Sequence, residues 1–447
     1  MNLKLKKGVS LNIAGAVPQG KMTPTVVKAS ESAIVPDDFE GFIPKLAVKE
    51  GDAVAVGTPL LYEKNHPEMK LVAPLAGRVR AVVRGDRRKI MRVVVEADNT
   101  VGATSPVWPK ATDEASARAL LAQSGLMAMM RRRPYAVVPE PNDVVRDIFV
   151  TAMDLAPLAV SPAVFSAIFS KEDYEAGVKV LSLITKGKIY LSHGSDWNLG
   201  DIRGAEMVAV EGPYPASNAG VQAANIRPVN KGEVIWTLDL PTLGRIGRLA
   251  SKGELETRTI VAVTGPEVAS PALVETTVGA PVAALLAGHI AEAAHHRRVI
   301  SGNVLVGTAV DADGYLEYPY RQVTVIAEGD DTTEFMGWAS FSPSKMSEST
   351  SFPGHFLKRL FRPDARLNGG RRAMIMSGQY DKAVPMDILT EYLVKAIMSG
   401  NIEDMEKLGI YEVAPEDFAA AEYADTSKLP LQKIIRDGLD YVRKELE

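Results

Sequence analysis

The chain has 447 residues, of which 46% are hydrophobic and 24% charged, as in ordinary globular proteins, and this length predicts about three domains. A net charge of −4 is too small to indicate nucleic acid as the main partner, and the absence of cysteine excludes disulfides, thiolate nucleophiles and Cys-ligated zinc or iron–sulfur sites. No signal peptide is evident and no apolar stretch reaches the roughly 20 residues of a membrane-spanning helix, so we expect any membrane contact to involve partners.

Residues 1–25 are rich in Gly, Pro and Lys without a lasting period, and we interpret them as an N-terminal arm. Between residues 26 and 105, short apolar runs are separated by glycine-containing turns, which predicts small antiparallel strands. The stretch 46–83 shows this pattern twice, and its second half carries an Ala-Pro pair at Ala73. It resembles the lipoyl/biotinyl carrier fold, so we expect an all-β hammerhead of the barrel-sandwich kind over 26–105.

The residue that would carry a prosthetic group in such a fold is absent. In carriers of this fold the modified lysine lies at a hairpin tip seven residues before the signature Ala, and here that position is His66. Imidazole cannot form the amide bond that attaches lipoate or biotin. Lys70 lies too close to Ala73, inside the returning strand. We therefore expect no modification on Lys64 or Lys70.

Basic residues cluster in two strips, at 78–92 and 358–372. Charge runs of this kind are most often solvated faces. The alternative for the first strip is a docking surface for an acidic partner or for anionic lipid headgroups. Both interpretations stay open at this point, and the same question applies to the second strip.

Residues 106–255 alternate between helical and strand patterns. Helices are expected at 114–130, 163–169, 171–184 and 243–252. Short apolar strands are expected at 136–138, 147–151, 188–191, 206–210 and 233–238. Strands that alternate with helices predict a parallel sheet covered by helices, so we expect a Rossmann-like α/β domain.

The third unit, residues 256–330, begins with an apolar strand at 259–263. Its order of elements, β-β-α-β-β, predicts a small β-grasp domain of the ubiquitin-like, SLBB type. Residues 331–447 are expected to form a helical C-terminal domain, with a helix that begins at Pro385 and ends before Gly400. A last helix is expected at 431–446. The fold class is thus α/β with additional all-β modules.

Two candidate ligand motifs are weak. The run GRIGRL at 244–249 would need a glycine at position 242 to complete a dinucleotide fingerprint, and Thr242 is there instead. An ordinary helix start explains the run better than NAD binding. His289, Glu292 and His296 could line one helix face as metal ligands, but no further ligand spacing accompanies them, so we expect no metal site. Neither a nucleophile elbow nor a phosphate-binding loop is present, and no catalytic residue is assigned.

Long stretches, in the same order along the whole chain, resemble the NqrA family. Members of this family form one of the subunits of the sodium-translocating NADH:quinone oxidoreductase. The stretches are LLAQSGLMAMMRRRPYAVVPEP, DIFVTAMDLAPLAVSP, GEVIWTLDLPTLGRIGRL, RRVISGNVLVGT and KIIRDGLDYVRKE. The same set of domains occurs in the RnfC protein of the Rnf complex and in the NADH-oxidising flavoprotein of respiratory complex I. Matches of this length are far more specific than any single motif.

The resemblance implies a peripheral protein on the cytoplasmic face of the bacterial inner membrane, beside the membrane-embedded members of its complex, of which NqrB is the expected neighbour. It implies a contribution to quinone binding or reduction, coupled to sodium export by a respiratory translocase, with quinone as a substrate of the complex. The alternative is a purely structural docking protein of the same complex, without a ligand of its own. A free-standing NAD dehydrogenase is disfavoured by the incomplete fingerprint.

The same resemblance predicts that this chain carries neither FMN, NAD nor an iron–sulfur cluster. Where the relatives have a glycine-rich flavin loop, only Gly125 remains, and Met127, Met129, Met130 and Arg131 are expected to fill the space. The positions that align with cluster-binding cysteines of the Rnf relative are Tyr380, Val384, Phe418, Ala421 and Asp425. None of these side chains can replace a thiolate ligand.

The segment from Met127 to Tyr135 is the predicted quinone site. Apolar walls with a few donors suit a quinone ring and its carbonyl groups, and we assign Met129, Arg131, Arg132, Arg133 and Tyr135 to this role. The alternative is a helix end with a solvated arginine run. If the assignment holds, Arg133→Ala or Tyr135→Ala should weaken quinone binding and leave the thermal midpoint nearly unchanged.

Overall fold

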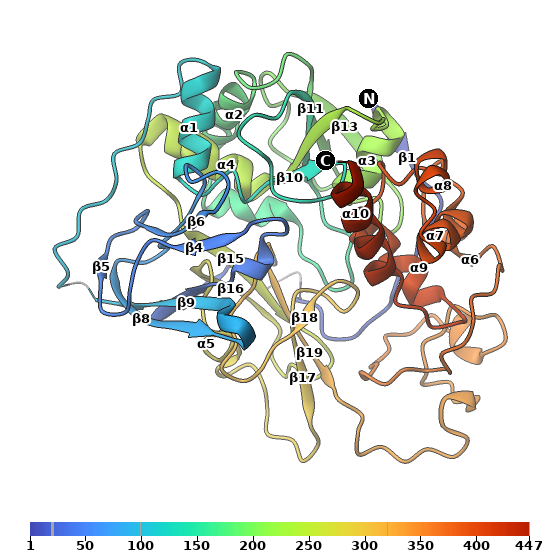
Figure 1. Cartoon of the computed structure of the whole chain (residues 1–447). Helices are drawn as coiled ribbons and strands as arrows, with labels where there is room; N and C mark the ends of the chain where they lie inside the picture. Colours follow the sequence, from blue (N-terminus) through green and yellow to red (C-terminus); the bar gives the residue numbers. More distant parts are fainter. Residues whose placement is uncertain (19–21, 99, 320, 447) are drawn as a thin grey trace.

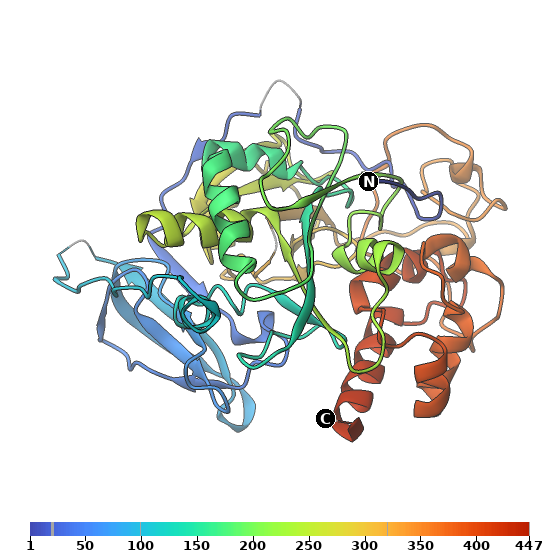
Figure 2. The ribbon, with the colours of Figure 1, turned by 90° about the horizontal axis from the view of Figure 1, so that it is seen from above.

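The computed structural model describes residues 1–447 apart from 19–21, 99, 320 and 447. An α/β unit occupies the middle of the molecule, with the barrel-sandwich strands on one side and the C-terminal helices on the other (Figures 1 and 2). A second β-rich unit lies below it in the view of Figure 1. The candidate site described below lies where three of these units meet.

The central sheet has six strands in the order β1-β13-β12-β11-β14-β10, all parallel except β10, which runs antiparallel to β14. The strands are β1 (Asn2–Lys4), β10 (Arg131–Arg133), β11 (Val145–Ala152), β12 (Ile189–His193), β13 (Glu206–Glu211) and β14 (Val234–Asp239). The helices of this unit are α1 (Glu114–Gln123), α2 (Lys171–Leu181), α3 (Ala219–Ile226) and α4 (Leu240–Lys252). The predicted α/β architecture is confirmed, although α3 was not predicted.

The prediction of a strand at 136–138 is wrong. The strand in this region is β10, at Arg131–Arg133, and the chain then turns back so that Arg132 N donates to Val137 O at 2.7 Å. Tyr135 (φ 78°) and Ala136 (φ 53°) form this turn in the left-handed region, which interrupts any strand there. The predicted helix at 163–169 is a 3-10 helix over Pro162–Ala167.

The N-terminal arm takes part in two sheets. Strand β1 forms the edge of the central sheet beside β13. Strand β2 (Thr25–Val26) pairs in parallel with β16 (Ala272–Thr277) of the third unit. Short backbone segments at the edge of a sheet give little sequence signal, because they contribute few buried side chains.

The barrel-sandwich unit consists of a four-stranded sheet, β3-β9-β8-β5, and a three-stranded sheet, β4-β6-β7. The strands are β3 (Glu31–Ile34), β4 (Pro44–Leu46), β5 (Ala53–Val54), β6 (Pro59–Glu63), β7 (Lys70–Val72), β8 (Gly77–Arg84) and β9 (Ile90–Ala97). His66 lies in the connection between the antiparallel strands β6 and β7, and Lys70 begins β7, as predicted.

The third unit is built on a six-stranded sheet in the order β18-β17-β19-β15-β16-β2. Its remaining elements are β15 (Arg258–Thr264), α5 (Val282–Leu286), β17 (Arg297–Ser301), β18 (Thr308–Ala309) and β19 (Gln322–Ala327). Helix α5 ends before His289, so His289, Glu292 and His296 do not share a helix face. Among the residues that the structure describes, no three His, Asp or Glu side chains gather closely enough to hold a metal ion.

The C-terminal domain is helical, as predicted. Its helices are α6 (Gln379–Ala383), α7 (Thr390–Ser399), α8 (Ile402–Lys407), α9 (Ala419–Ala424) and α10 (Leu431–Leu446). Helix α7 begins at Thr390 and not at Pro385, because Leu389 has a non-helical conformation (ψ 79°) and is 57% exposed. The predicted end is confirmed, with Gly400 in the left-handed region at φ 69°. In the described part of the chain, no helix combines the length and apolar character needed to cross a membrane.

The GRIGRL run lies inside helix α4 and sets how closely that helix approaches α2. The helix begins before the run, at Leu240, because Asp239 caps it and Pro241 fits its first turn. A side chain at Gly247 would place its Cβ 1.6 Å from the backbone oxygen of Asp173. The run is therefore a helix-packing motif within the folded core.

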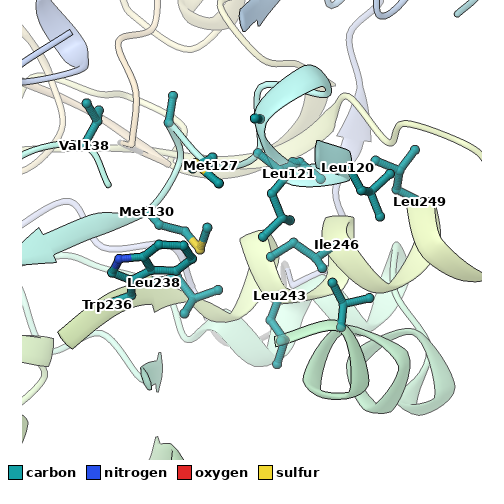
Figure 3. Close-up of a cluster of buried hydrophobic side chains, with 14 of the residues drawn as sticks. Leu120, Leu121, Met127, Met130, Val138, Trp236, Leu238, Leu243, Ile246 and Leu249 are labelled. Atoms are coloured by element: carbon teal, nitrogen blue, oxygen red, sulfur yellow. The ribbon is translucent and has the colours of Figure 1, made fainter. Parts of the chain in front are cut away.

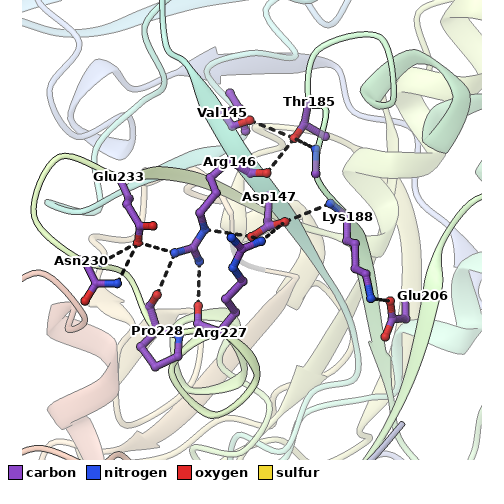
Figure 4. A network of polar contacts seen from close by, with 11 residues as sticks. Val145, Arg146, Asp147, Thr185, Lys188, Glu206, Arg227, Pro228, Asn230 and Glu233 are labelled. Atoms are coloured by element: carbon purple, nitrogen blue, oxygen red, sulfur yellow. Dashed lines mark hydrogen bonds and ion pairs between the residues drawn. The ribbon is translucent and has the colours of Figure 1, made fainter.

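A polar network fixes the amino-terminal ends of the parallel strands. Asp147, which is fully buried, accepts a hydrogen bond from Lys188 N at 2.9 Å and pairs with Arg227 at 3.0 Å and Arg146 at 2.9 Å (Figure 4). Thr185 donates from Oγ1 to Val145 O at 2.9 Å. Side chains of the chain itself satisfy these polar groups, and ligands of such sheets usually bind at the opposite, carboxyl ends of the strands.

Candidate functional site

The methionine-rich loop after α1 is packed into the core. Met127 and Met130 are fully buried in one hydrophobic cluster, and Met130 lies beside Trp236 and Leu238 (Figure 3). Met129 is partly buried and contacts the same cluster. Met127 and Met130 are therefore part of the core; that they fill the space a flavin would need stays a prediction.

The arginine run does not form one pocket, because its members turn to different neighbours. Arg131 donates from Nη2 to the backbone oxygen of Asp38 at 2.8 Å, on the barrel-sandwich side. The Nε atom of Arg132 lies 3.1 Å from the carboxylate of Asp143. Asp143 also accepts a hydrogen bond from Trp236 Nε1 at 2.8 Å. The interpretation as a solvated helix end is wrong, because the segment is a strand and Arg132 and Arg133 are buried.

Arg133 and Tyr135 face the C-terminal helices. Arg133, with only 2% of its side chain exposed, lies 3.0 Å from Asp417 and 2.9 Å from Glu416. Burial alone would lower the pKa of Arg133, but the two carboxylates hold it above its ordinary value. Tyr135 packs edge to face on Tyr411, with ring centroids 6.3 Å apart. Both side chains join the central sheet to the C-terminal domain.

Three units meet at an aromatic stack that we call the three-unit junction (Asp38, Phe39, Arg131 and Tyr318). Phe39 and Tyr318 stack with centroids 5.5 Å apart and planes 7° from parallel. The guanidinium of Arg131 lies over the Tyr318 ring at 5.9 Å. Tyr318 donates from its hydroxyl to Met129 O at 2.7 Å and from its backbone to Asp38 at 2.7 Å.

Burial shifts the titration of two groups at this junction. It raises the pKa of Asp38 well above the ordinary carboxyl value, although the hydrogen bond from Tyr318 N opposes the shift. It also raises the pKa of Tyr318 to about 12. Tyr318 is therefore a hydrogen-bond donor at neutral pH, and Asp38 is poised to bind a proton more readily than a solvated aspartate.

A small apolar cavity lies beside the junction. Its walls include Phe39, Leu71, Leu126 and Met129, and its volume is about 40 Å³, enough for water but not for a ring. Arg245 from helix α4 also lines it. Arg245 is 3% exposed and donates to Glu256 O at 3.1 Å and to Arg258 O at 2.9 Å.

The crevice at the carboxyl ends of β11 and β14 is occupied by an ion pair. Asp239, the last residue of β14, caps helix α4 through Thr242 N at 2.9 Å and pairs with Arg321 of the third unit. Burial alone would raise the pKa of Asp239, but Arg321 and the Thr242 hydrogen bonds lower it. The guanidinium of Arg321 also lies 5.6 Å over the Phe165 ring. Side chains thus fill the usual ligand position of such a sheet.

A larger, open cleft lies between the loop before β14 and the C-terminal domain. Its volume is about 540 Å³, and Lys231, Ile388, Leu408, Tyr411 and Glu412 are among the residues that line it. Burial and the nearby Asp387 raise the pKa of Glu412 to about 6. The walls mix charged and apolar groups, unlike a typical pocket for an apolar ring.

The positions that we predicted to align with cluster ligands of the Rnf relative are part of the C-terminal core. Tyr380, Val384, Phe418 and Ala421 are fully buried within one hydrophobic cluster. Asp425 accepts hydrogen bonds from Ser427 N at 3.0 Å and Leu429 N at 2.7 Å. Each of these side chains has a packing or capping role in this fold.

Of the predicted site residues, Met129 and Arg131 lie at the junction and its cavity, but four other members were not predicted. Arg245 lies in the GRIGRL run, which the sequence pattern favours as an ordinary helix start, without a ligand role. Asp38, Phe39 and Tyr318 come from distant parts of the chain and carry no local motif. Only the folded arrangement brings them together.

Comparison with known families gives three matches in chain order. Residues 3–98 match the NqrA N-terminal barrel-sandwich hybrid domain, 112–255 the NqrA second alpha/beta domain and 260–312 the NQRA C-terminal domain. These matches agree with the barrel-sandwich, α/β and third units of the structure.

Solved structures give only a distant similarity. The chain of an NAD+-reducing [NiFe]-hydrogenase in the air-oxidized state has a TM-score of 0.35 and 15% identity, over 50% of this chain and 49% of that chain. The H2-reduced state of such an enzyme gives a TM-score of 0.36 and 13% identity, over 49% of this chain and 47% of that chain.

Full-length relatives are much more similar. The NqrA protein of the Na(+)-translocating NADH-quinone reductase from Serratia proteamaculans is 34% identical over 453 residues, which cover 99% of this chain and 100% of the relative. The corresponding proteins of Yersinia pestis and Neisseria meningitidis serogroup A are also 34% identical, with the same shares covered. The chain therefore belongs to the NqrA family, whose members are one of the subunits of the Na(+)-translocating NADH-quinone reductase.

Proposed function

We propose that this chain contributes to quinone binding or reduction at the three-unit junction, without carrying flavin, NAD or an iron–sulfur cluster. It is then a peripheral protein at the cytoplasmic face of the membrane, with NqrB as its neighbour. The relatives are named as subunits of a quinone reductase, and we assign quinone binding to a specific site in this chain. The observation that carries the proposal is the pairing of an apolar cavity with the guanidinium of Arg245.

Arg245 suits a quinone carbonyl for a simple reason. Two of its donor nitrogens are engaged by backbone oxygens, and the described residues offer no hydrogen-bond partner to the third, Nη1. A buried guanidinium with an unused donor stabilises a carbonyl oxygen or the anion that forms on reduction. Met129 and Phe39 provide apolar surface for the ring.

Entry of a ring requires a side chain to move, because the cavity is only about 40 Å³. Met129 is the side chain best suited to do so, since a thioether has flexible torsions and adapts to irregular space. Arg131 and Tyr318 hold the backbone of residues 128–130 through hydrogen bonds to the oxygens of Ala128 at 3.2 Å and Met129 at 2.7 Å. The Met129 side chain can therefore move while its backbone stays fixed.

Three features support the absence of redox cofactors in the proposal. The chain has no cysteine for an iron–sulfur cluster. The Asp239–Arg321 pair occupies the crevice where parallel sheets hold nucleotides. Met127 and Met130 fill the loop that aligns with the flavin loop of the relatives. Electrons would then reach quinone from cofactors on other members of the complex.

We also propose the finer fold assignments. The hairpin with His66 between β6 and β7 supports an unmodified lipoyl/biotinyl-like hammerhead over 26–105. The four parallel strands β11 to β14 support a Rossmann-like domain over 106–255. A mixed sheet with one short helix supports a β-grasp domain over 256–330.

Titration of the purified chain with a water-soluble ubiquinone analogue tests the proposal. We expect saturable binding that Arg245→Gln weakens by about one to two powers of ten, the effect of losing a charge-assisted hydrogen bond of ~1.5–3 kcal/mol. Arg245→Lys, which retains a charge, should lose less. Arg87→Gln, on an exposed turn of the barrel-sandwich unit, is the matched control, and a thermal melt of each variant shows that it is folded.

A second candidate, the purely structural docking protein, is favoured by the small volume of the cavity and by the buried Arg133–Asp417 pair. Both are features of a scaffold whose interior is closed. The same titration separates the two functions. Absence of saturable binding in the wild-type chain would support the scaffold and contradict the quinone site.

A further inference from the structure

A run of six consecutive exposed residues, His355–Leu360, lies in the segment between the third unit and the C-terminal helices; we call it the HFLKRL loop. Three of its side chains are large and apolar. Phe356 is 68% exposed and Leu360 is 65% exposed, and Leu357 lies between them. A folded chain seldom leaves so many large apolar groups together in water, because removing apolar surface from water is favourable.

The HFLKRL loop is held firmly at both ends. On its C-terminal side, Phe361 is 2% exposed, and its backbone donates to Asn12 O at 2.8 Å and accepts from Ala14 N at 2.8 Å. On its N-terminal side, Gly354 packs so closely on the Lys345 backbone that a Cβ would lie 1.8 Å from its oxygen. The exposure of the loop is thus a property of the fold.

The sequence around the loop is basic. Residues 349–380 contain six Lys and Arg residues and one acidic residue, Asp364, while Glu348 and Asp381 flank this stretch. The charge of Glu348 interacts with His355 at the start of the loop. Arg362 pairs with Glu267 at 3.2 Å and Arg366 pairs with Asp364 at 2.6 Å. Lys358 and Arg359, in the loop itself, have no carboxylate within ion-pair distance among the described residues.

We propose that the HFLKRL loop binds an anionic lipid bilayer, with Phe356, Leu357 and Leu360 at the level of the headgroups and Lys358 and Arg359 against lipid phosphates. This inference rests on the proposed function only in placing the chain beside a membrane. Interfacial segments are held on anionic membranes by burial of apolar side chains and by electrostatic attraction to the headgroups. The loop offers apolar side chains for the first and cations for the second. All six loop residues are exposed, so a bilayer can cover them without the matching pocket that a protein partner would need.

Flotation of the purified full chain with vesicles tests the proposal. We expect binding to vesicles of phosphatidylglycerol and phosphatidylcholine, weaker binding to pure phosphatidylcholine, and a loss of binding as salt is added. The double variant Lys358→Gln, Arg359→Gln should bind about thirty-fold more weakly, since each cation near an anionic surface strengthens binding about fivefold. Phe356→Ser with Leu360→Ser should weaken binding about tenfold or more.

Matched controls carry the same changes elsewhere on the surface. Lys179→Gln with Lys186→Gln removes two exposed charges from the α/β unit, outside both basic strips, and Val107→Ser removes an apolar side chain that is 94% exposed. Neither control should alter flotation. None of the loop variants should change the affinity for the quinone analogue, which keeps this test separate from the quinone site.

Two outcomes would overturn the membrane assignment. One is equal flotation of the wild-type chain with anionic and neutral vesicles, or none with either. The other is unchanged flotation of both loop variants. If the wild-type chain ignores vesicles and the loop variants no longer copurify with the other members of the complex, the loop binds protein and the proposal is wrong.

Discussion

The guanidinium of Arg133 lies 3.0 Å from the carboxylate of Asp417, although 284 residues separate them in the chain. Both side chains are almost completely excluded from water, and burial raises the pKa of Asp417 even though Arg133 opposes the shift. A buried pair of this kind fixes which surfaces meet, since either charge alone in the interior would be very unfavourable. It joins the edge strand β10 to the C-terminal helices.

Arg133→Ala should destabilise the protein by about 3–5 kcal/mol, because it leaves Asp417 buried without its partner. The result differs from the unchanged thermal midpoint that the sequence pattern alone predicts. Denaturant unfolding measures the free energy of unfolding of variant and wild type. Arg87→Ala, in an exposed turn, is the control and should change stability by no more than about 0.5 kcal/mol.

The reverse outcome would be equally informative. If Arg133→Ala unfolds like the wild type and binds the quinone analogue more weakly, Arg133 belongs to the quinone site and its pairing with Asp417 is dispensable.

Gly247→Ala should destabilise the α/β unit by about 3 kcal/mol or more, because the new methyl group collides with the backbone oxygen of Asp173. A backbone oxygen cannot rotate away as a flexible side chain would. Gly102→Ala, where no atom lies within 4 Å of the added Cβ, is the control. Thermal melts of the two variants should differ clearly, and equal melting would contradict the close packing of α2 on α4.

The stability contribution of Glu412 should depend on pH. Its pKa is raised from 4.5 to about 6, so the folded chain binds more protons than the unfolded chain between these values. The free energy of unfolding therefore falls as the pH rises through this window. Glu412→Gln removes this titrating group. The free energy of unfolding of the variant minus that of the wild type should therefore increase by at most about 2 kcal/mol from pH 4 to pH 7.

Denaturant unfolding at both pH values measures this difference. Glu445→Gln, an exposed substitution in helix α10, controls for the loss of a carboxylate. A pH-independent difference between Glu412→Gln and wild type would show that Glu412 titrates like a solvated glutamate.

Neither lipoate nor biotin should be attached to the barrel-sandwich unit. His66 lies in the β6–β7 connection, and Lys70 is already paired in β7 opposite Tyr62. Intact-mass and peptide mass spectrometry of chain produced with lipoate and biotin ligases present should show unmodified Lys64 and Lys70. An adduct on either lysine would mean that the hairpin adopts another register.

The purified chain should be colourless and free of iron. The physical reasons are the ion pair of Asp239 with Arg321 in the crevice and the lack of any cysteine. Absorption spectra and metal analysis of the purified chain check this expectation. A flavin band or iron at near-stoichiometric amounts would contradict the proposed division of cofactors within the complex.

The order of the units follows from sequence, since hydrophobic periodicity separates alternating strands from amphipathic helices. Helix α10 is found at its predicted bounds because its apolar face is regular over four turns. The strand β10 was missed because three consecutive arginines carry no apolar period. Their burial depends on Asp143 and Asp417, which no local pattern indicates.

The site was predictable only in part. The methionine loop gave a usable signal, because flexible apolar side chains beside donors are an unusual composition. Arg245 and Tyr318 could not be predicted, because they reach the cavity and the aromatic stack through the packing of α4 and the third unit. Contacts between units depend on tertiary geometry, which a single sequence does not encode locally.

Strand β1 has a consequence for biosynthesis. The amino group of Met1 donates to Met207 O at 3.0 Å, across a separation of 206 residues, and the strand that follows pairs with β13. Translation proceeds from the N-terminus, so this first strand leaves the ribosome long before its partner has been made. A nascent chain halted ahead of Glu211 has an unpaired strand and an exposed sheet edge, both of which invite pairing with other chains.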